Sequence, residues 1–366
     1  MRKILCFTFG VLFFCTCDSE ANRINNQNEI SNELIQNDSS NTELNAAYYF
    51  NEKLSDIENA IILNPSSPNV YYKRAIYYKL RKKYSLALED INRSIKLSPD
   101  AAIFNFEKAD ILFEFGVFKM DVSKIDEAEI YLDHTLTLDK SLEEALLLKA
   151  EILLFKKDAE GSIRLVNDIL KNNNTHANAY FTKGRIYHFM GSNELAISSY
   201  QTAIEMDPNF YDAFISLGVL LSEKMDPKSI DYYNSAIEIF PSSIEAHRNK
   251  GLFYFFSSDY LLAQKSFNNV IDIDSTFEEA YFNIGNTYIG MFSDTMDNYS
   301  KDTTLNKAIS YFKKAIELNP RYVQAIHNLG LQYEFKGNKE KAKEYYLRAI
   351  EIDNNYTPSL DAINQL

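Results

Sequence analysis

The stretch ANAYFTKGRIYHFMGSNELAISSYQTAIEMDPNF, residues 177–210, decides the fold because its pattern recurs along most of the chain. In its first half, Tyr180, Gly184 and Tyr187 are spaced by four and three residues, so they share one face of a helix. Gly191 follows as a turn signal, because glycine suits the C-terminal end of a helix. The first half therefore predicts a helix followed by a turn.

The second half of the stretch predicts another helix. Ala196, Tyr200 and Ala203 again recur at intervals of four and three residues. Pro208 then closes the unit, because proline cannot continue a helix and often begins the next segment. The unit is therefore a pair of helices joined by a turn, with small residues where the two helices cross.

One small residue marks the same unit along the whole chain. Its positions are separated by 34, 41, 34, 34, 33, 34 and 45 residues, so a period of 34 survives two insertions and one deletion. A period of this size predicts a solenoid of stacked helix pairs, in which each unit buries its apolar face against its neighbours. The marking residues are Ala75, Ala109, Ala150, Gly184, Gly218, Gly251, Gly285 and Gly330.

Two further columns of the repeat hold large residues. A large residue usually stands four positions before the small one, although Asn105 departs from this and residues 102–176 are the least regular part. In the second helix, a small residue is followed four positions later by a bulky one. The large first-helix residues are Tyr71, Leu146, Tyr180, Phe214, Tyr281 and Ile326, and the bulky second-helix residues are Ile91, Leu132, Val166, Tyr200, Tyr233, Phe267, Phe312 and Tyr346.

These columns together resemble the tetratricopeptide repeat, from about residue 45 to the C-terminus. The resemblance implies an all-α fold, a right-handed α-solenoid of about eight helix–turn–helix repeats over residues 68–356. Residues 44–67 and 357–366 are expected to form capping helices that cover the ends of the stack. The expected repeats are 68–101, 102–142, 143–176, 177–210, 211–243, 244–277, 278–322 and 323–356.

The resemblance also implies that the first helices line a concave groove that binds a peptide segment of a partner protein. The Lys/Asn/Arg clamp by which some members hold a peptide carboxylate is absent, because Asn286 matches only one of its elements. An aromatic and apolar groove suits an extended or helical segment anchored by apolar side chains. Packing of these aromatics within their own repeats is the alternative. The expected groove residues are Tyr72, Phe106, Phe181, Arg185, Arg248, Phe282, Asn286 and His327.

The N-terminus predicts export. Residues 1–16 contain two basic residues and then an apolar run, which is typical of a signal peptide and too short to span a bilayer. The run ends at Cys17 and resembles a bacterial lipoprotein signal, in which this cysteine is acylated. An ordinary secretory peptide cut after Cys17 is the alternative. The polar residues 17–43 are expected to carry the lipid anchor and to form a disordered tether.

Composition limits the chemistry of the chain. All three cysteines lie at or before Cys17, so neither a disulfide framework nor a Cys-ligated metal site is expected beyond it. The net charge of −13 disfavours nucleic acid and anionic membrane surfaces as general partners. The five histidines are scattered through separate units, and no nucleophile, base and orienting group come together. We therefore expect no catalytic residues, no metal and no cofactor, and we do not expect an enzyme.

Two insertions interrupt the period. Residues 114–127 contain Phe115, Phe118 and Met120, which predict an exposed apolar loop that marks a contact site or folds back onto the second repeat. Residues 290–304 carry several carboxylates without the spacing of a calcium loop, so a solvated loop is expected there.

The leading functional hypothesis is a membrane-anchored protein-interaction scaffold in the bacterial cell envelope. The lipid on Cys17 would hold it to the outer membrane, facing either the periplasm or the exterior, and the groove would hold an envelope protein. Alternatives are a pilotin-like assembly factor for a secretion or pilus system, and an accessory binder of cell-wall enzymes or glycan. Self-association through an exposed terminal repeat is a further alternative.

Overall fold

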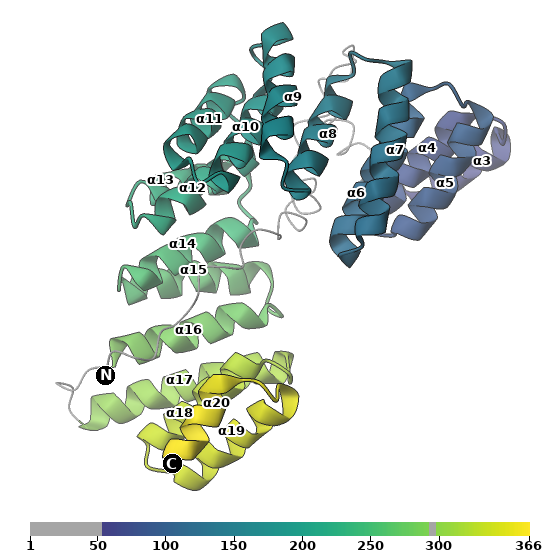
Figure 1. Cartoon of the computed structure of the whole chain (residues 1–366). Helices are drawn as coiled ribbons and strands as arrows, with labels where there is room; N and C mark the ends of the chain where they lie inside the picture. Colours follow the sequence, from purple (N-terminus) through teal and green to yellow (C-terminus); the bar gives the residue numbers. More distant parts are fainter. Residues whose placement is uncertain (1–52, 293–297) are drawn as a thin grey trace. The chain divides into compact units, whose positions relative to one another are not determined.

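A computed structural model describes residues 53–292 and 298–366, and all regular structure in these ranges is helical (Figure 1). The chain divides into two compact units, which meet in sequence between Ala213 and Phe214. Of the 18 helices of the described residues, 16 pack as eight pairs, as stacked helix–turn–helix units do, and the first and the last are single. The expected fold class, an all-α solenoid of helix pairs, is confirmed.

Unit 1 contains the first four helix pairs. Each first helix begins where the sequence repeat begins. The helices of unit 1 are α3 (Leu54–Leu63), α4 (Pro68–Lys79), α5 (Tyr84–Leu97), α6 (Ala102–Lys119), α7 (Val122–Leu138), α8 (Glu143–Phe155), α9 (Ala159–Asn172), α10 (Ala177–Phe189) and α11 (Asn193–Met206).

Unit 2 contains the remaining pairs and a final single helix. Most of α12 lies in this unit, although its first residues belong to unit 1. The helices are α12 (Tyr211–Glu223), α13 (Ser229–Ile239), α14 (Ile244–Phe256), α15 (Tyr260–Ile273), α16 (Glu278–Met291), α17 (Asn298–Leu318), α18 (Val323–Phe335), α19 (Lys339–Ile352) and α20 (Thr357–Gln365).

The two single helices lie where capping helices were expected. The helix α3 falls within residues 44–67, of which the part before residue 53 lies outside the described residues. The helix α20 falls within residues 357–366 and packs against α19. Its Ser359 is fully buried and bonds His327 of α18, with 2.9 Å between Oγ and Nδ1. This contact attaches α20 to the last repeat.

The crossing of the two helices in each repeat is its tightest contact. At five crossings a glycine of the first helix lies directly on an aromatic ring of the second. A Cβ atom built on these glycines would stand 2.5 to 2.7 Å from a ring carbon, a distance that packed atoms do not tolerate. The five pairs are Gly184 with Tyr200, Gly218 with Tyr233, Gly251 with Phe267, Gly285 with Phe312, and Gly330 with Tyr346.

The other three crossings use a different combination. Where the first helix carries alanine, the bulky residue of the second helix is aliphatic, and both side chains are fully buried. The smaller partner leaves room for the extra methyl group, so the total volume at the crossing is conserved. These pairs are Ala75 with Ile91, Ala109 with Leu132, and Ala150 with Val166.

A second recurring contact fastens the start of the first helix. At four repeats the residue four positions before the small one donates a hydrogen bond to a backbone carbonyl six residues earlier, in the turn between repeats. Asn105 departs from the large-residue column but makes this same bond, so the column also admits a side chain that reaches the carbonyl. The bonds are Tyr71 to Pro65 (3.0 Å), Asn105 to Pro99 (3.1 Å), His247 to Pro241 (3.1 Å) and Tyr281 to Ser275 (3.0 Å).

The expectation of a loop over residues 114–127 is wrong, although Phe118 and Met120 are exposed as expected. The helix α6 runs on to Lys119 and α7 already begins at Val122, so the extra residues lengthen both helices to 18 and 17 residues. The physical reason is burial. Phe115 stacks on Tyr84 of the preceding repeat at 5.3 Å between ring centroids, which a solvated loop would forgo.

The second insertion is also largely helical. The expectation of a solvated loop over residues 290–304 is wrong for residues 298–304, which form the first two turns of α17, while residues 293–297 lie outside the described residues. This helix has 21 residues against 14 in α15. Seven extra residues are about two turns, so α17 lengthens without rotating its buried face.

The turn inside each repeat has a common backbone. In seven repeats one residue of this turn has a positive φ, between 54° and 76°. Only two of the seven are glycine, the residue that adopts this conformation without steric cost. The positions are Lys82, Met120, Lys157, Gly191, Met225, Ser258 and Gly337.

This geometry predicts that Lys157→Gly stabilises the protein. Lys157 is exposed and has a φ of 66°, and a side chain in the left-handed region costs about 1 kcal/mol relative to glycine. We expect the urea midpoint, followed by far-UV circular dichroism, to rise by the equivalent of about 0.5–1 kcal/mol. Gly191→Ala, at the equivalent turn, should lower it by a similar amount. A lower midpoint for Lys157→Gly would contradict the assignment of strain to this turn.

Candidate peptide-binding surface

The first helices of unit 1 present a row of apolar side chains, here called the apolar row: Tyr72, Phe106, Leu147 and Phe181. Each residue occupies the same column, three positions before the small crossing residue of its repeat. All four side chains are half-buried, so each contributes both to the core and to the surface. Successive first helices thus place one apolar group per repeat on the same face of unit 1.

Members of the apolar row rest on the core beneath them. The ring of Phe181 lies 5.0 Å from that of Phe210 and 5.6 Å from that of Tyr200. Tyr72 lies 5.4 Å from Phe104. Packing within the repeats, the alternative that the sequence left open, therefore accounts for part of each side chain, while the exposed part remains available to a ligand.

A second column, one helical turn further on, carries charges beside the apolar row. Arg185 donates from Nη1 to Oε1 of Glu151 at 2.7 Å, and these side chains are 39% and 29% exposed. The guanidinium carbon of Arg185 also lies 6.0 Å from the ring centre of Phe181. Arg185 is therefore held between the neighbouring repeat and the apolar row.

An ion cluster of three residues lies at the other end of this column. Lys79 contacts Oδ2 of Asp110 at 2.6 Å and Oε1 of Glu107 at 2.8 Å. Burial lowers the pKa of Lys79, but the attraction of Asp110 and Glu107 outweighs it and holds the pKa well above its ordinary value. Burial also raises the pKa of Glu107, against the opposing attraction of Lys79. The cluster fixes α4 against α6 and leaves Asp110 on the surface.

The equivalent positions of unit 2 do not form an open apolar row. Phe282 is only 3% exposed and packs against Phe312 and Tyr322, with ring centroids 5.8 and 5.0 Å away. His327 is 8% exposed and lies between Tyr346 and Tyr356. The structure therefore places these two expected groove residues in the core of unit 2.

The remaining two expected residues of unit 2 are engaged with neighbouring repeats. Arg248 forms a two-pronged contact with Glu279, at 2.8 Å from Nε and 2.7 Å from Nη2. Asn286 accepts a hydrogen bond from Asn328 at 2.9 Å. Both contacts join one first helix to the next, so they stabilise the stack of unit 2.

Sequence reasoning missed the carboxylate partners of the two arginines. A signal for one of them was present, because Glu151 lies 34 residues before Arg185 and so occupies the same column of the preceding repeat. Stacked repeats bring equivalent columns together, as cross-strand positions meet in a sheet. No comparable signal marks Glu279, which contacts Arg248 from a different column of its repeat.

Other features of the described residues lie away from the apolar row. A shallow hollow of about 330 Å³ lies between α17 and α19, and another of about 540 Å³ lies along α9. Within residues 53–292 and 298–366, no three His, Cys, Asp or Glu side chains are grouped to hold a metal ion. None of the helices in these ranges combines the length and the apolar character needed to cross a bilayer.

Comparison with known proteins supports the repeat assignment. A model of the tetratricopeptide repeat matches residues 177–210, 298–322 and 323–356. A TPR repeat-containing protein of Methanocaldococcus jannaschii is 24% identical over 323 residues, which cover 84% of this chain and 49% of that protein. Superkiller complex protein 3 of Homo sapiens is 26% identical over 220 residues, covering 57% of this chain and 14% of the human protein. The chain thus spans half or less of the length of these relatives.

A solved structure agrees with the fold. The C-terminal part of a TPR repeat-containing protein from Cytophaga hutchinsonii superposes with a TM-score of 0.53 at 18% identity, covering 70% of this chain and 98% of that one. The helix pairs, their crossings and their stacking define a helical-repeat protein. More narrowly, the described chain is a tetratricopeptide-repeat α-solenoid.

The buried imidazole of His327 predicts a pH dependence of stability. Burial lowers its pKa to about 4, whereas the pKa of an unfolded histidine is about 6.5. The unfolded state therefore takes up the proton first as the pH falls, and stability is lost between pH 6.5 and pH 4. At pH 5 this loss is about 2 kcal/mol.

The matching measurement is urea unfolding of the wild type and of His327→Gln at pH 7 and pH 5. The wild type should lose more stability between these two pH values than the variant, by about 2 kcal/mol. Equal losses in the two proteins would show that His327 is not buried in its neutral form.

Proposed function

We propose that this chain is an interaction scaffold that holds a peptide segment of an envelope protein on the first-helix surface of unit 1. The apolar row carries the proposal, because four half-buried side chains recur at one per repeat on a single face. A segment with apolar side chains at matching intervals would cover their exposed parts. Unit 1 supplies this surface, since the same columns of unit 2 include Phe282 and His327 in its core.

The charges beside the apolar row limit the class of partner. Asp110 and Glu151 border the row, and each already faces one cation of the chain, Lys79 and Arg185 respectively. A bound segment would lie against these ion pairs rather than against isolated charges. Its own polar groups would therefore form hydrogen bonds with side chains that are already paired. The Glu151–Arg185 pair is exposed enough to contribute little to stability, about 0–1 kcal/mol, which leaves it free to serve orientation.

Localisation to the cell envelope is part of the same proposal. The signal at residues 1–16 and the polar residues 17–43 support acylation of Cys17 and attachment to the outer membrane, with the solenoid facing the periplasm or the exterior. These residues lie outside the described part of the chain. Growth with an alkyne-tagged fatty acid should label the protein, and Cys17→Ser should abolish the label and release the protein from membranes.

The surface assignment predicts that reversing one ion pair abolishes partner binding. The double variant Glu151→Arg with Arg185→Glu keeps an attractive pair between α8 and α10 but exchanges its ends. A photo-crosslinking amino acid at Phe106, in the native host, should yield a defined adduct in the wild-type background. We expect the double variant to reduce its yield at least tenfold, with the thermal midpoint nearly unchanged.

The matched control exchanges Arg248 and Glu279 in unit 2, which form a pair of similar geometry. This exchange should leave the adduct at Phe106 intact. An undiminished adduct in the Glu151/Arg185 exchange, or loss of the adduct in both exchanges, would contradict recognition on unit 1.

A further inference from the structure

The turn between α6 and α7 exposes more apolar surface than its position in the fold requires. Residues 118–122, here called the α6–α7 tip, contain Phe118, Met120 and Val122, which are 50%, 88% and 56% exposed. The tip ends the long α6–α7 hairpin, whose two helices pack along their length (Figure 1). Three large apolar side chains within five residues, all facing solvent, are typical of a contact surface.

The backbone of the tip is strained as well as exposed. Met120 has a φ of 54°, in the left-handed region that favours glycine. The methionine gains no burial in this position, since its side chain is 88% exposed. The same backbone conformation recurs in the turn of seven repeats, so exposure rather than strain distinguishes the tip.

Basic residues surround the tip. The ring of Phe118 lies 5.7 Å from that of Tyr84, so the first-repeat turn that ends at the exposed Lys83 lies beside the tip. On the other side, Lys156 reaches Asp126 and Glu129 of α7 at 2.7 Å each, which brings the third-repeat turn and its exposed Lys157 alongside. The exposed Lys119 lies within the tip itself. Lysines therefore lie on both sides of the apolar cluster.

The local charge of this edge opposes the charge of the chain. The turns 80–84, 118–122 and 156–158 contain six cations and two carboxylates, a net of +4, which falls to +2 when Asp126 and Glu129, the partners of Lys156, are included; the whole chain carries −13. The two carboxylates, Asp121 and Asp158, cap the helices that follow them. Basic residues are thus concentrated where the apolar side chains are exposed.

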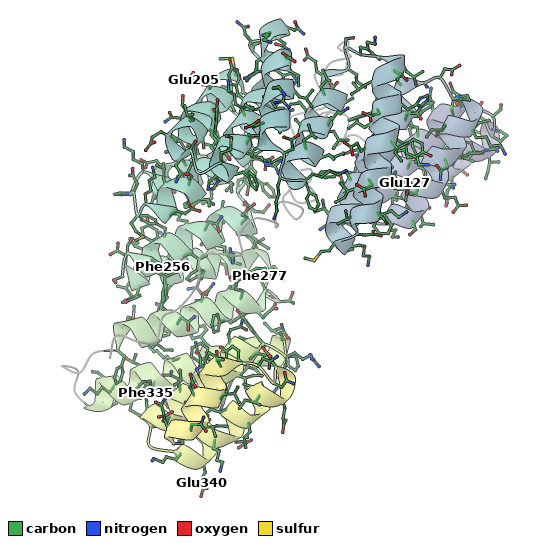
Figure 2. All side chains as sticks on the ribbon, viewed as in Figure 1. Glu127, Glu205, Phe256, Phe277, Phe335 and Glu340 are labelled. Atoms are coloured by element: carbon green, nitrogen blue, oxygen red, sulfur yellow. The ribbon has the colours of Figure 1, made fainter. Side chains whose placement is uncertain are left out.

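The turns at the opposite ends of the same helices differ in charge and in exposed apolar side chains. The turns 98–101, 139–142 and 173–176 contain none of the large apolar side chains that are exposed in the described part of the chain. They carry two carboxylates and one lysine, a net of −1. The basic character is therefore specific to one edge of the first three repeats, while the opposite edge has Ile103 and Leu138 beside its turns, at 40% and 37% exposure. Turns of the same type in unit 2 carry Phe256 and Phe335, which lie on one edge of that unit (Figure 2).

We propose that the α6–α7 tip inserts into an anionic lipid surface, with Lys83, Lys119 and Lys157 against the lipid phosphates. A convex apolar tip suits a deformable phase, because rigid protein partners offer such side chains a preformed pocket. Each lysine near an anionic leaflet adds electrostatic attraction, because the lipid phosphates give that surface a negative potential. The net charge of the chain disfavours such a surface as a general partner, whereas the charge of this edge favours it.

The inference is independent of acylation at Cys17 and of the peptide surface. An acyl chain would bring the chain to a membrane from the N-terminal side of the tether, whereas the tip would fix which edge of unit 1 faces the lipid. A test without any acyl group therefore separates the two.

The chain contains no tryptophan, so a single substitution provides a specific reporter. The sample is a protein of residues 17–366 with the substitutions Cys17→Ser and Met120→Trp, which includes every described residue. It is mixed with vesicles of phosphatidylglycerol and phosphatidylcholine. Insertion should shift the fluorescence emission of the tryptophan at position 120 to shorter wavelength, and lipids with brominated acyl chains should quench that fluorescence. The matched control is Ile130→Trp, on α7 of the same hairpin and 68% exposed, which should show neither effect.

Charge dependence completes the test. Lys83→Glu, Lys119→Glu and Lys157→Glu together should weaken vesicle binding at least tenfold, as should vesicles of phosphatidylcholine alone, while circular dichroism stays unchanged. An unshifted and unquenched reporter at position 120 on anionic vesicles would overturn the proposal. Equal quenching at positions 120 and 130, or equal binding to neutral vesicles, would overturn it too.

Discussion

The structure depends on one contact, the seating of a small first-helix residue on a bulky second-helix side chain at each crossing. Five crossings place glycine on a ring so closely that a methyl group has no room, and three place alanine on an aliphatic side chain. The volume at the crossing is thus conserved while its chemistry varies. The crossing sets how each pair packs, and the pair in turn sets which first-helix side chains reach the surface.

This dependence explains why the fold was readable from sequence. The marking residues recur in register with their bulky partners, and both follow helical spacing, so Gly184 and Tyr200 in one unit predict Gly251 and Phe267 in another. The sequence predicts loops for the two insertions because the repeat pattern stops there. Phe115 stacks on Tyr84 of the preceding repeat, and a local sequence pattern cannot predict a contact between two repeats.

The candidate surface was predictable in part. The column rule located Phe106 and Phe181 correctly on first helices, but it could not tell a half-buried position from a buried one. Phe282 occupies the same column and is buried, although its ring neighbours Phe312 and Tyr322 match those of the half-buried Phe181. Exposure depends on the neighbours in three dimensions. The apolar row and the α6–α7 tip also differ in kind, since the row consists of half-buried residues that also belong to the core, whereas the apolar side chains of the tip are at least half exposed.

The central claim is that the small and the bulky residue of each crossing are energetically coupled, because each fits only the size of the other. A double-mutant cycle at Gly251 and Phe267 tests it most directly. Gly251→Ala and Phe267→Leu should each destabilise the protein by about 1–3 kcal/mol, through overpacking and through a cavity respectively. Together they recreate the alanine–leucine pair of Ala109 and Leu132, so the double variant should be at least as stable as either single one, with a coupling of at least about 1 kcal/mol. Additive losses would contradict the account.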